Sequence, residues 1–135
     1  MIKLTSTKQT LINQLAKDHQ LELLILFGSQ ITGQTHRESD FDIGYVSQRE
    51  LTSEDEGRLI ISLMPIVEQK DERMINLVNL KRVTPLLLYA ATSRCQILYE
   101  STSTTFFALR AYAFKQYLEI KPLYQLKAER LGIKL

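Results

Sequence analysis

The chain is poor in cysteine and has no long hydrophobic run. It contains one cysteine and no tryptophan among 135 residues. The single thiol, Cys95, cannot form a disulfide within the chain, and we interpret it as a buried apolar position rather than a nucleophile. No stretch reaches the roughly 18 apolar residues of a membrane-spanning helix, and residues 1–5 lack the apolar run of a signal peptide. These absences exclude a disulfide scaffold and predict a cytoplasmic protein with no membrane partner.

The charge balance is too weak to indicate a nucleic-acid binder. Lys and Arg number 17 against 15 Asp and Glu, for a formal charge of +2, and no cluster of basic and aromatic residues forms an evident groove. Direct nucleic-acid binding and DNA polymerisation are therefore not expected. An apolar content of 44% with 24% charged residues is ordinary for a globular protein. The length suits one domain over residues 1–135.

Helix and strand patterns alternate along the chain and predict an α/β (α+β) fold, a small mixed sheet with helices packed against it. Ser6 or Thr7 is expected to cap a first helix that ends near His19. Leu21 to Phe27 is a nearly unbroken apolar run, which indicates a strand covered on both faces. The later elements expected are strands at 40–47, 73–80 and 96–99, and helices from 52, from 84 to 94 and from 106. The buried helix positions expected are Leu11, Ile12 and Leu15, then Leu59, Ile60, Leu63 and Met64.

The first chemical signal is Gly28-Ser29, directly after the apolar run. A glycine at a strand-to-helix turn lets a phosphate approach the backbone, because no Cβ is in the way. Ser29 adds a hydroxyl donor, and the amides of a helix that begins here would point at an anion. A Gly-Ser pair is also a common turn, so the pair alone is equally compatible with a structural role.

Two carboxylates open the next predicted strand. Residues two apart in a strand project from the same face, so Asp40 and Asp42 should point one way while Phe41, Ile43 and Tyr45 point into the core. Two hard oxygen ligands suit Mg²⁺ bridged to nucleotide phosphates, and do not suit zinc. Together with the preceding turn, the two carboxylates predict a site for a metal-bound nucleotide.

The spacing Gly28-Ser29-x10-Asp40-x-Asp42 resembles the motif of the minimal nucleotidyltransferases, in the polymerase-β-like superfamily. The resemblance covers about residues 8–100 and extends to the MntA antitoxins, which are paired with HEPN-domain toxins. It implies a polymerase-β-like nucleotidyltransferase fold and transfer of AMP from Mg-ATP to a hydroxyl of the toxin, with tyrosine as the leading acceptor. The same resemblance implies that Gly28 and Ser29 bind the nucleotide, and that Asp40 and Asp42 are catalytic residues and ligands of Mg²⁺.

One departure from the family concerns its third carboxylate. The family pattern is similar to Val-Asp-Leu-Val-Asp-Leu, whereas residues 75–80 read Ile-Asn-Leu-Val-Asn-Leu. The third carboxylate serves as a general base and metal ligand, whereas an amide can coordinate through its oxygen but cannot accept the proton. Asn76 therefore stands at the third catalytic position without a base. Asp71 or Glu72 could substitute, although nothing in the sequence places either of them.

The C-terminal segment, about residues 103–132, is expected to be a helical extension of the core. Residues 106–135 carry six Lys and Arg against two Glu, a net +4, whereas residues 1–105 come to −2. Apolar and aromatic residues spread over more than one stripe of this helix, and Pro122 is expected to start a further helical turn. One interpretation packs the helix wholly on its own domain. The other is that part of its surface docks a protein partner, since interfaces favour Tyr, Phe and Arg.

Other polar residues give weaker signals. Arg37, in the loop before Asp40, is a candidate triphosphate contact because guanidinium pairs well with phosphate oxygens. His36 is expected to be solvated, and His19 is interpreted as a polar helix end. The acidic residues expected to form a solvated helix start rather than a second metal site are Glu50, Glu54, Asp55 and Glu56.

Three functions are consistent with these residues. An adenylyltransferase that modifies a HEPN-type toxin is the leading hypothesis. A pseudoenzyme antitoxin that neutralises its partner by binding alone is favoured by Asn76 and Asn79. A small-molecule nucleotidyltransferase, such as one that modifies an aminoglycoside, is the third. Those enzymes generally carry a second domain for the drug, and this chain has little room for one.

Overall fold

The computed structural model describes residues 1–33 and 40–133. Its centre is a sheet with strand order β3-β2-β1-β4, in which β2 and β3 are parallel and the other neighbours are antiparallel. The strands are β1 (Leu21–Phe27), β2 (Phe41–Ser47), β3 (Ile75–Asn79) and β4 (Gln96–Glu100). The helices are α1 (Ser6–Asp18), α2 (Ser29–Thr32), α3 (Ser53–Val67), α4 (Pro85–Ser93) and α5 (Thr105–Leu131), with a 3-10 helix, η1, at Glu72–Met74. This order confirms the predicted mixed α/β fold.

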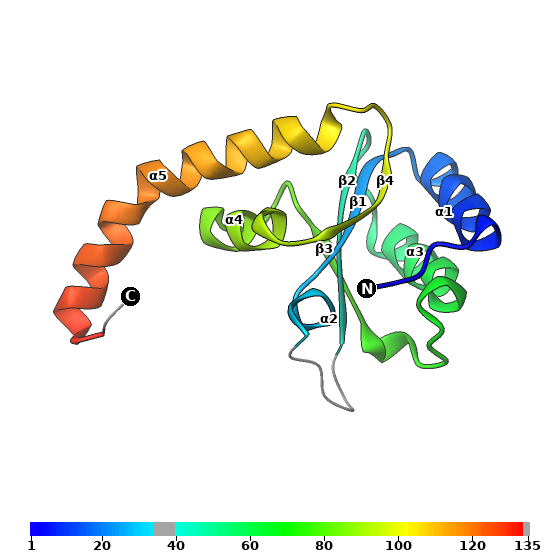
Figure 1. Cartoon of the computed structure of the whole chain (residues 1–135), viewed down its shortest axis with the longest axis horizontal. Coiled ribbons are helices and arrows are strands. Elements are labelled where there is room, and N and C mark those ends of the chain that lie inside the picture. Colours follow the sequence, from blue (N-terminus) through cyan, green and yellow to red (C-terminus); the bar gives the residue numbers. More distant parts are fainter. Residues whose placement is uncertain (34–39, 134–135) are drawn as a thin grey trace.

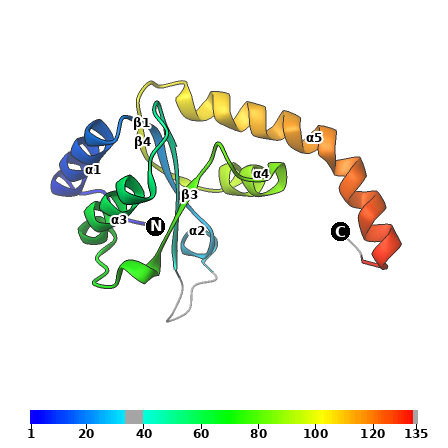
Figure 2. The same ribbon diagram turned by 180° about the vertical axis from the view of Figure 1, so that it is seen from behind.

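Helices cover both faces of the sheet. Figure 1 shows α1 and α3 on one side and α4 with the first part of α5 on the other, and Figure 2 shows the same layers from behind. Leu24 and Leu26 of β1 belong to the apolar cluster under α1 and α3, whereas Leu23, Ile25 and Phe27 belong to the cluster under α4 and α5. Fully burying such a side chain contributes about 1.5–3 kcal/mol. The two layers therefore confirm that β1 is covered on both faces.

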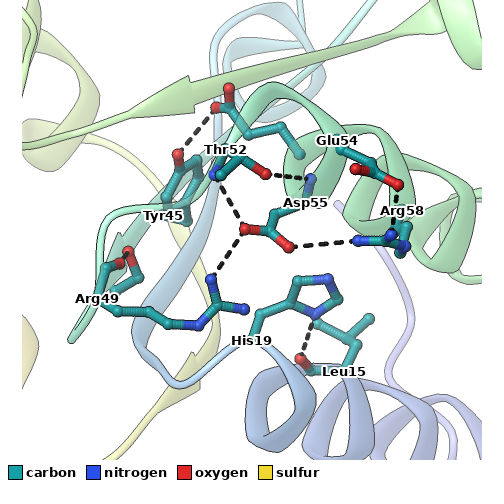
Figure 3. A network of polar contacts seen from close by, with 10 residues as sticks. Leu15, His19, Tyr45, Arg49, Thr52, Glu54, Asp55 and Arg58 are labelled. Carbon is teal, nitrogen blue, oxygen red and sulfur yellow. Dashed lines mark hydrogen bonds and ion pairs between the residues drawn. The ribbon is translucent and has the colours of Figure 1, made fainter.

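The start of α3 is fixed by a capping box. The Asp55 N–H donates to the Thr52 hydroxyl at 3.1 Å, and the Thr52 N–H donates to the Asp55 carboxylate at 3.0 Å (Figure 3). Arg49 and Arg58 donate to the same carboxylate at 2.8 and 3.4 Å. The hydrogen bond from Arg49, followed by those from Thr52, holds the pKa of Asp55 below its usual range. The acidic cluster is thus a helix start, as predicted, with paired rather than free carboxylates.

The first helix differs from the prediction at two positions. Thr5, and not Ser6 or Thr7, is the cap, because its hydroxyl accepts a hydrogen bond from the Lys8 N–H at 3.2 Å. Leu11 is 42% exposed, so the predicted buried face is wrong there. The side chains that α1 buries are Ile12, Leu15 and Ala16.

The third strand is shorter than predicted. It begins at residue 75 rather than 73, because residues 72–74 form η1. The Asp71 side chain accepts a hydrogen bond from the Arg73 N–H at 3.0 Å and so caps this turn. The following helix begins as predicted, with Thr84 as its cap and Pro85 in its first turn.

The C-terminal helix α5 is one continuous helix of 27 residues, and Pro122 lies inside it. The prediction that Pro122 starts a separate turn is therefore wrong. A proline removes one intrahelical donor and kinks a helix, but the chain can continue on both sides of the kink. Figure 1 shows that α5 bends and carries its second half away from the sheet. None of the helices within residues 1–33 and 40–133 is long and apolar enough to cross a membrane.

Candidate functional site

Three of the candidate residues meet at one end of the sheet. Phe27, the last residue of β1, is paired with Asp42 of β2 across the antiparallel ladder. Asp42 is paired with Asn76 across the parallel ladder between β2 and β3. Gly28 follows β1 as the cap of α2, and Ser29 is the first residue of that helix. The structure thus brings Gly28, Asp42 and Asn76 to adjacent positions, although 34 residues separate the last two.

Gly28 allows the Asp42 carboxylate to lie directly against the turn. Its φ of +79° and ψ of −152° belong to a region that essentially only glycine adopts. A Cβ at Gly28 would lie 2.1 Å from Oδ2 of Asp42. The space that a side chain would fill is therefore occupied by a carboxylate oxygen. The sequence suggested that this glycine makes room for a phosphate, but it gave no signal for the close approach of Asp42.

Asn76 donates a hydrogen bond to Asp42. Its Nδ2 lies 3.0 Å from Oδ1 of Asp42. A carboxylate only accepts hydrogen bonds, so the amide must present its nitrogen and not its oxygen to Asp42. The Asp42 carboxylate is thus held on two sides, with Asn76 at Oδ1 and the Gly28 backbone beside Oδ2.

The remaining candidates are less closely placed. Asp40 is exposed and directly precedes β2, so it lies just outside the strand that was expected to align it with Asp42. Ser29 is half-buried at the start of α2. Arg37 and His36, the candidate phosphate contact and its neighbour, lie outside the described residues. The three alternate residues expected in the core do pack there, namely Phe41, Ile43 and Tyr45.

The donor set at this end of the sheet fits one hard divalent cation. Asp40 and Asp42 offer carboxylate oxygens, which Mg²⁺ takes together with phosphate oxygens and water. Asn76 directs toward Asp42 an amide nitrogen, which is not a metal ligand. In the described parts of the chain, no group of three or more His, Cys, Asp and Glu residues could hold a metal ion. The residues therefore fit a cation completed by nucleotide phosphates, and they do not fit an all-protein metal cage.

Asp71, one candidate for the missing base, is engaged elsewhere. Its carboxylate accepts hydrogen bonds from the Arg73 side chain, with Arg73 Nη2 at 3.0 Å from Asp71 Oδ2. The Arg73 side chain first, and then the Arg73 N–H, hold the pKa of Asp71 below its ordinary value. A carboxylate with a lowered pKa is a weaker base. Glu72, the other candidate, is exposed in η1.

Three other titratable groups have structural surroundings. The buried His19 ends α1, and its Nδ1 lies 2.9 Å from the Leu15 carbonyl oxygen, which places the ring proton on that nitrogen (Figure 3). The Tyr45 hydroxyl donates to Glu56 at 2.8 Å, and burial, followed by this bond, raises the pKa of Tyr45. Cys95 packs against the cluster under α5, and burial raises its pKa to about 11. Cys95 is half-buried rather than fully buried as predicted, and a raised pKa disfavours the thiolate that a nucleophile needs.

A second feature is the exposed apolar surface of α5. Ala113 and Ala128 are buried, but large side chains remain exposed along the helix, so the interpretation that α5 packs wholly on its own domain is wrong. Tyr117 stacks on Tyr89 of α4, with ring centroids 4.0 Å apart. Beside this pair lies a groove of about 480 Å³ between α4 and the second half of α5. We use the name α5 surface for the exposed large apolar and aromatic residues of α5, which are Phe107, Tyr112, Phe114, Leu118, Leu123, Leu126 and Leu131.

Known proteins match this chain at the level of a family model and of solved structures. Residues 9–104 match the family model described as Polymerase beta, Nucleotidyltransferase. That range contains β1 to β4 and the turn at Gly28. A comparison with curated protein sequences found no match.

Chains from toxin–antitoxin complexes share the fold. A toxin–antitoxin with AMP-PNP is 21% identical with a TM-score of 0.74, and the match covers 92% of this chain and 98% of that one. The toxin–antitoxin MntA-HepT is 18% identical with a TM-score of 0.70, over 95% and 99% of the two chains. A further match is a structure of a tri-AMPylated HEPN toxin from Shewanella oneidensis in complex with an MNT antitoxin. The sequence identity is 18% and the TM-score is 0.70, and the match covers 96% of this chain and 99% of that one. Coverage this high extends past residue 104 into α5, so the shared fold includes this helix.

Proposed function

The chain belongs to the polymerase β nucleotidyltransferase family, and from that premise we propose that it is an antitoxin that transfers AMP from ATP to a tyrosine hydroxyl of a HEPN-domain toxin. The observation that carries the proposal is the end of the sheet where Gly28, Asp42 and Asn76 meet. The fold supports it as well, because it matches chains from toxin–antitoxin complexes, one with AMP-PNP and one with an AMPylated toxin. In this proposal the transferred AMP neutralises the toxin.

In the proposed reaction, the acceptor oxygen of the toxin forms a bond to the α-phosphorus of ATP. The bond from that phosphorus to the oxygen bridging to the β-phosphate breaks, and pyrophosphate leaves. Gly28 and Ser29 bind the β- and γ-phosphates, through the backbone of the turn and the serine hydroxyl. Asp40 and Asp42 hold Mg²⁺, which when bound stabilises the charge that develops on the leaving pyrophosphate.

The proton of the acceptor hydroxyl meets no carboxylate at position 76. The Asn76 amide is neutral and does not take up a proton, so in this proposal the proton passes to water. General-base catalysis contributes about 10²–10⁴-fold. We therefore expect transfer to be slower, by up to that factor, than in a relative with a carboxylate at this position.

The toxin is proposed to dock in part on the α5 surface. Phe107 is 74% exposed and Leu118 is 52% exposed. Residues 106–135 carry a net +4, so these apolar side chains have basic neighbours. Protein interfaces combine exposed aromatic and apolar side chains with a charged rim. An acidic face on the toxin would complement this helix.

A second candidate function is neutralisation by binding alone. The observation in its favour is Asn76, whose amide nitrogen is already bonded to Asp42 and which offers no general base. A pseudoenzyme would keep the fold and the α5 surface and would neutralise the toxin by covering it. The two candidates differ in one measurable respect, which is whether the mass of the toxin changes.

The decisive experiment is intact mass spectrometry of the co-purified partner after incubation with this protein, Mg²⁺ and ATP. The test variant is Asp40→Asn/Asp42→Asn, which removes both negative charges and keeps the side-chain shapes. The matched control is Asp18→Asn, because Asp18 ends α1 and its carboxylate accepts an exposed hydrogen bond from Gln14 at 2.8 Å.

We expect the partner to gain one or more AMP units with wild-type protein and with Asp18→Asn, and none with the double variant. Stable co-purification with no mass change in any sample would reject adenylylation and support neutralisation by binding. A mass gain that persists in the double variant would reject the assignment of Asp40 and Asp42.

A further inference from the structure

We infer that Asn76 is a positioning residue that fixes the Asp42 carboxylate and limits this end of the sheet to a single divalent cation. The inference rests on the proposed nucleotide site and adds to it a role for the amide that replaces the family's third carboxylate. Its starting point is the juxtaposition of Gly28, Asp42 and Asn76.

The first step of the argument is orientation. The Asn76 amide donates to Oδ1 of Asp42 at 3.0 Å, and Oδ2 of Asp42 occupies the space where a side chain of residue 28 would begin. The hydrogen bond orients the carboxylate, and the missing side chain at residue 28 leaves room for Oδ2 at the turn that leads into Ser29. A freely rotating carboxylate would lose conformational freedom when it binds a cation, whereas this one is already held in place.

The second step is charge. Asp40 and Asp42 together supply two negative charges, which balance one divalent cation. A third carboxylate in place of Asn76 would stand within hydrogen-bond distance of Asp42, and the repulsion between the two would be relieved by a further cation. Asn76 removes that repulsion and replaces it with a hydrogen bond. Without nucleotide, the site as built therefore has no need of a second cation.

Mn²⁺ binding to the isolated protein, without nucleotide or partner, tests both steps. Electron paramagnetic resonance of free Mn²⁺ gives the number and affinity of bound ions. The informative variants are Asn76→Asp and Asn76→Ala. The matched control is Asn79→Asp, which adds the same charge to the same strand. Asn79 accepts a hydrogen bond from the Lys81 N–H at 3.0 Å, a bond that an aspartate would keep.

We expect one Mn²⁺ per wild-type chain and per Asn79→Asp chain, and two per Asn76→Asp chain. Asn76→Ala should still bind one ion, but about tenfold more weakly, because a hydrogen bond to a charged group is lost without any change in charge. If Asn76→Ala does not fold, Asn76→Val makes the same test with a side chain that has no donor and is suited to a strand.

Three results would overturn the inference. A count other than one for the wild-type chain, or an unchanged count in Asn76→Asp, would reject the single-cation site. Wild-type affinity in Asn76→Ala would reject the positioning role. None of these results depends on AMP transfer, so failure here is distinguishable from failure of the proposed function.

Discussion

At the end of the sheet, Asp42 has a contact on each side, whereas along α5 large apolar side chains lie open to solvent. The Asp42 carboxylate is fixed by the Asn76 amide and the Gly28 backbone. On α5, Phe107, Leu118 and Leu123 are each more than half exposed. In the first region, the contacts that orient Asp42 all come from the chain itself. The second has the character of a surface that needs another molecule to cover it.

The difference shows that the residues with a defined geometry and the exposed apolar residues lie in separate parts of the chain. Interlocking strand registers and a glycine define the geometry around Asp42, so a small change there should disturb the fold as well as the site. The α5 surface contributes little to the stability of the chain, so changes there should be visible only when a partner is present. This contrast leads to four predictions, which run from the largest expected effect to the smallest.

The largest effect should come from Gly28→Ala. The new Cβ would have to displace Oδ2 of Asp42, and residue 28 would keep a φ of +79°. We expect a loss of about 2–4 kcal/mol in the free energy of unfolding, measured by chemical denaturation, together with loss of Mn²⁺ binding. Gly33→Ala is the matched control, since Gly33 has a φ of +76° but a Cβ added there would meet no atom of the described residues within 4 Å.

Gly33→Ala should lose only about 1 kcal/mol, the cost of a left-handed backbone. Equal losses in the two variants would show that backbone strain alone explains the role of Gly28. The contact with Asp42 would then have no energetic importance, and the contrast between the two regions would weaken.

The next effect concerns binding. Phe107→Ser with Leu118→Ser should change the free energy of unfolding by no more than about 0.5 kcal/mol, because both side chains are largely exposed. The same double variant should weaken binding to the toxin at least about tenfold if either residue is an interface anchor. Ile61→Ser is the control, since Ile61 of α3 is 59% exposed on the other layer of the molecule. Unchanged binding by calorimetry in the double variant would exclude these residues from the interface.

A smaller effect is expected from Asp55→Asn in acid. Hydrogen bonds from Arg49 and Thr52 lower the pKa of Asp55, so its contribution to stability is complete above the ordinary carboxyl range and disappears as the pH falls. The variant should therefore melt below the wild type at pH 7, and the difference should begin to narrow only below about pH 4, closing as the pH falls through the lowered pKa of Asp55. Glu54→Gln, which removes a neighbouring exposed charge paired with Arg58, is the control. If the difference in melting temperature between Asp55→Asn and the wild type stayed constant with pH, the lowered pKa of Asp55 would be contradicted.

The last prediction changes no residue and concerns Cys95, at the boundary between the two regions. Its thiol packs with Phe106 and Leu109 of α5 against the cluster on the sheet. Since burial raises its pKa to about 11, from an ordinary 9.0, the thiolate fraction at pH 8 should be about a hundredfold lower than normal. Labelling with iodoacetamide should thus be very slow in the native protein and fast after denaturation. Fast labelling without denaturant would mean that α5 separates from the sheet.

Much of the fold follows from local patterns in the sequence. The apolar run of β1, the Thr84-Pro85 helix start and the acidic start of α3 all act through neighbouring residues, so a single chain is enough to find them. The element boundaries that differ from the prediction depend on competition between neighbouring residues. Thr5 and Ser6 are both good capping residues, so the sequence does not decide between them, and the Thr5 side chain makes the capping hydrogen bond. The side chain of Asp71 caps η1, which shortens β3.

The site was predictable in its residues but not in its contacts. The spacing predicted Gly28 and Asp42 as site residues, and the family resemblance added Asn76, without the structure. The hydrogen bond from Asn76 to Asp42 depends on the register between β2 and β3, and alternation of residue types does not determine that register. The continuous helix through Pro122 was also missed, because a proline within a helix is tolerated or not according to how the chain around it can adjust.

The length and bend of α5 have a consequence for how a target is selected. A helix of 27 residues reaches about 40 Å, less whatever its bend removes. If a toxin binds to this helix while its acceptor residue enters the end of the sheet, the distance between the two contacts determines which toxin residue can be modified. Residues that lie at the wrong distance from the docking face are then passed over, whatever their local sequence. Shortening α5 by one turn would move the point of modification along the toxin rather than abolish it.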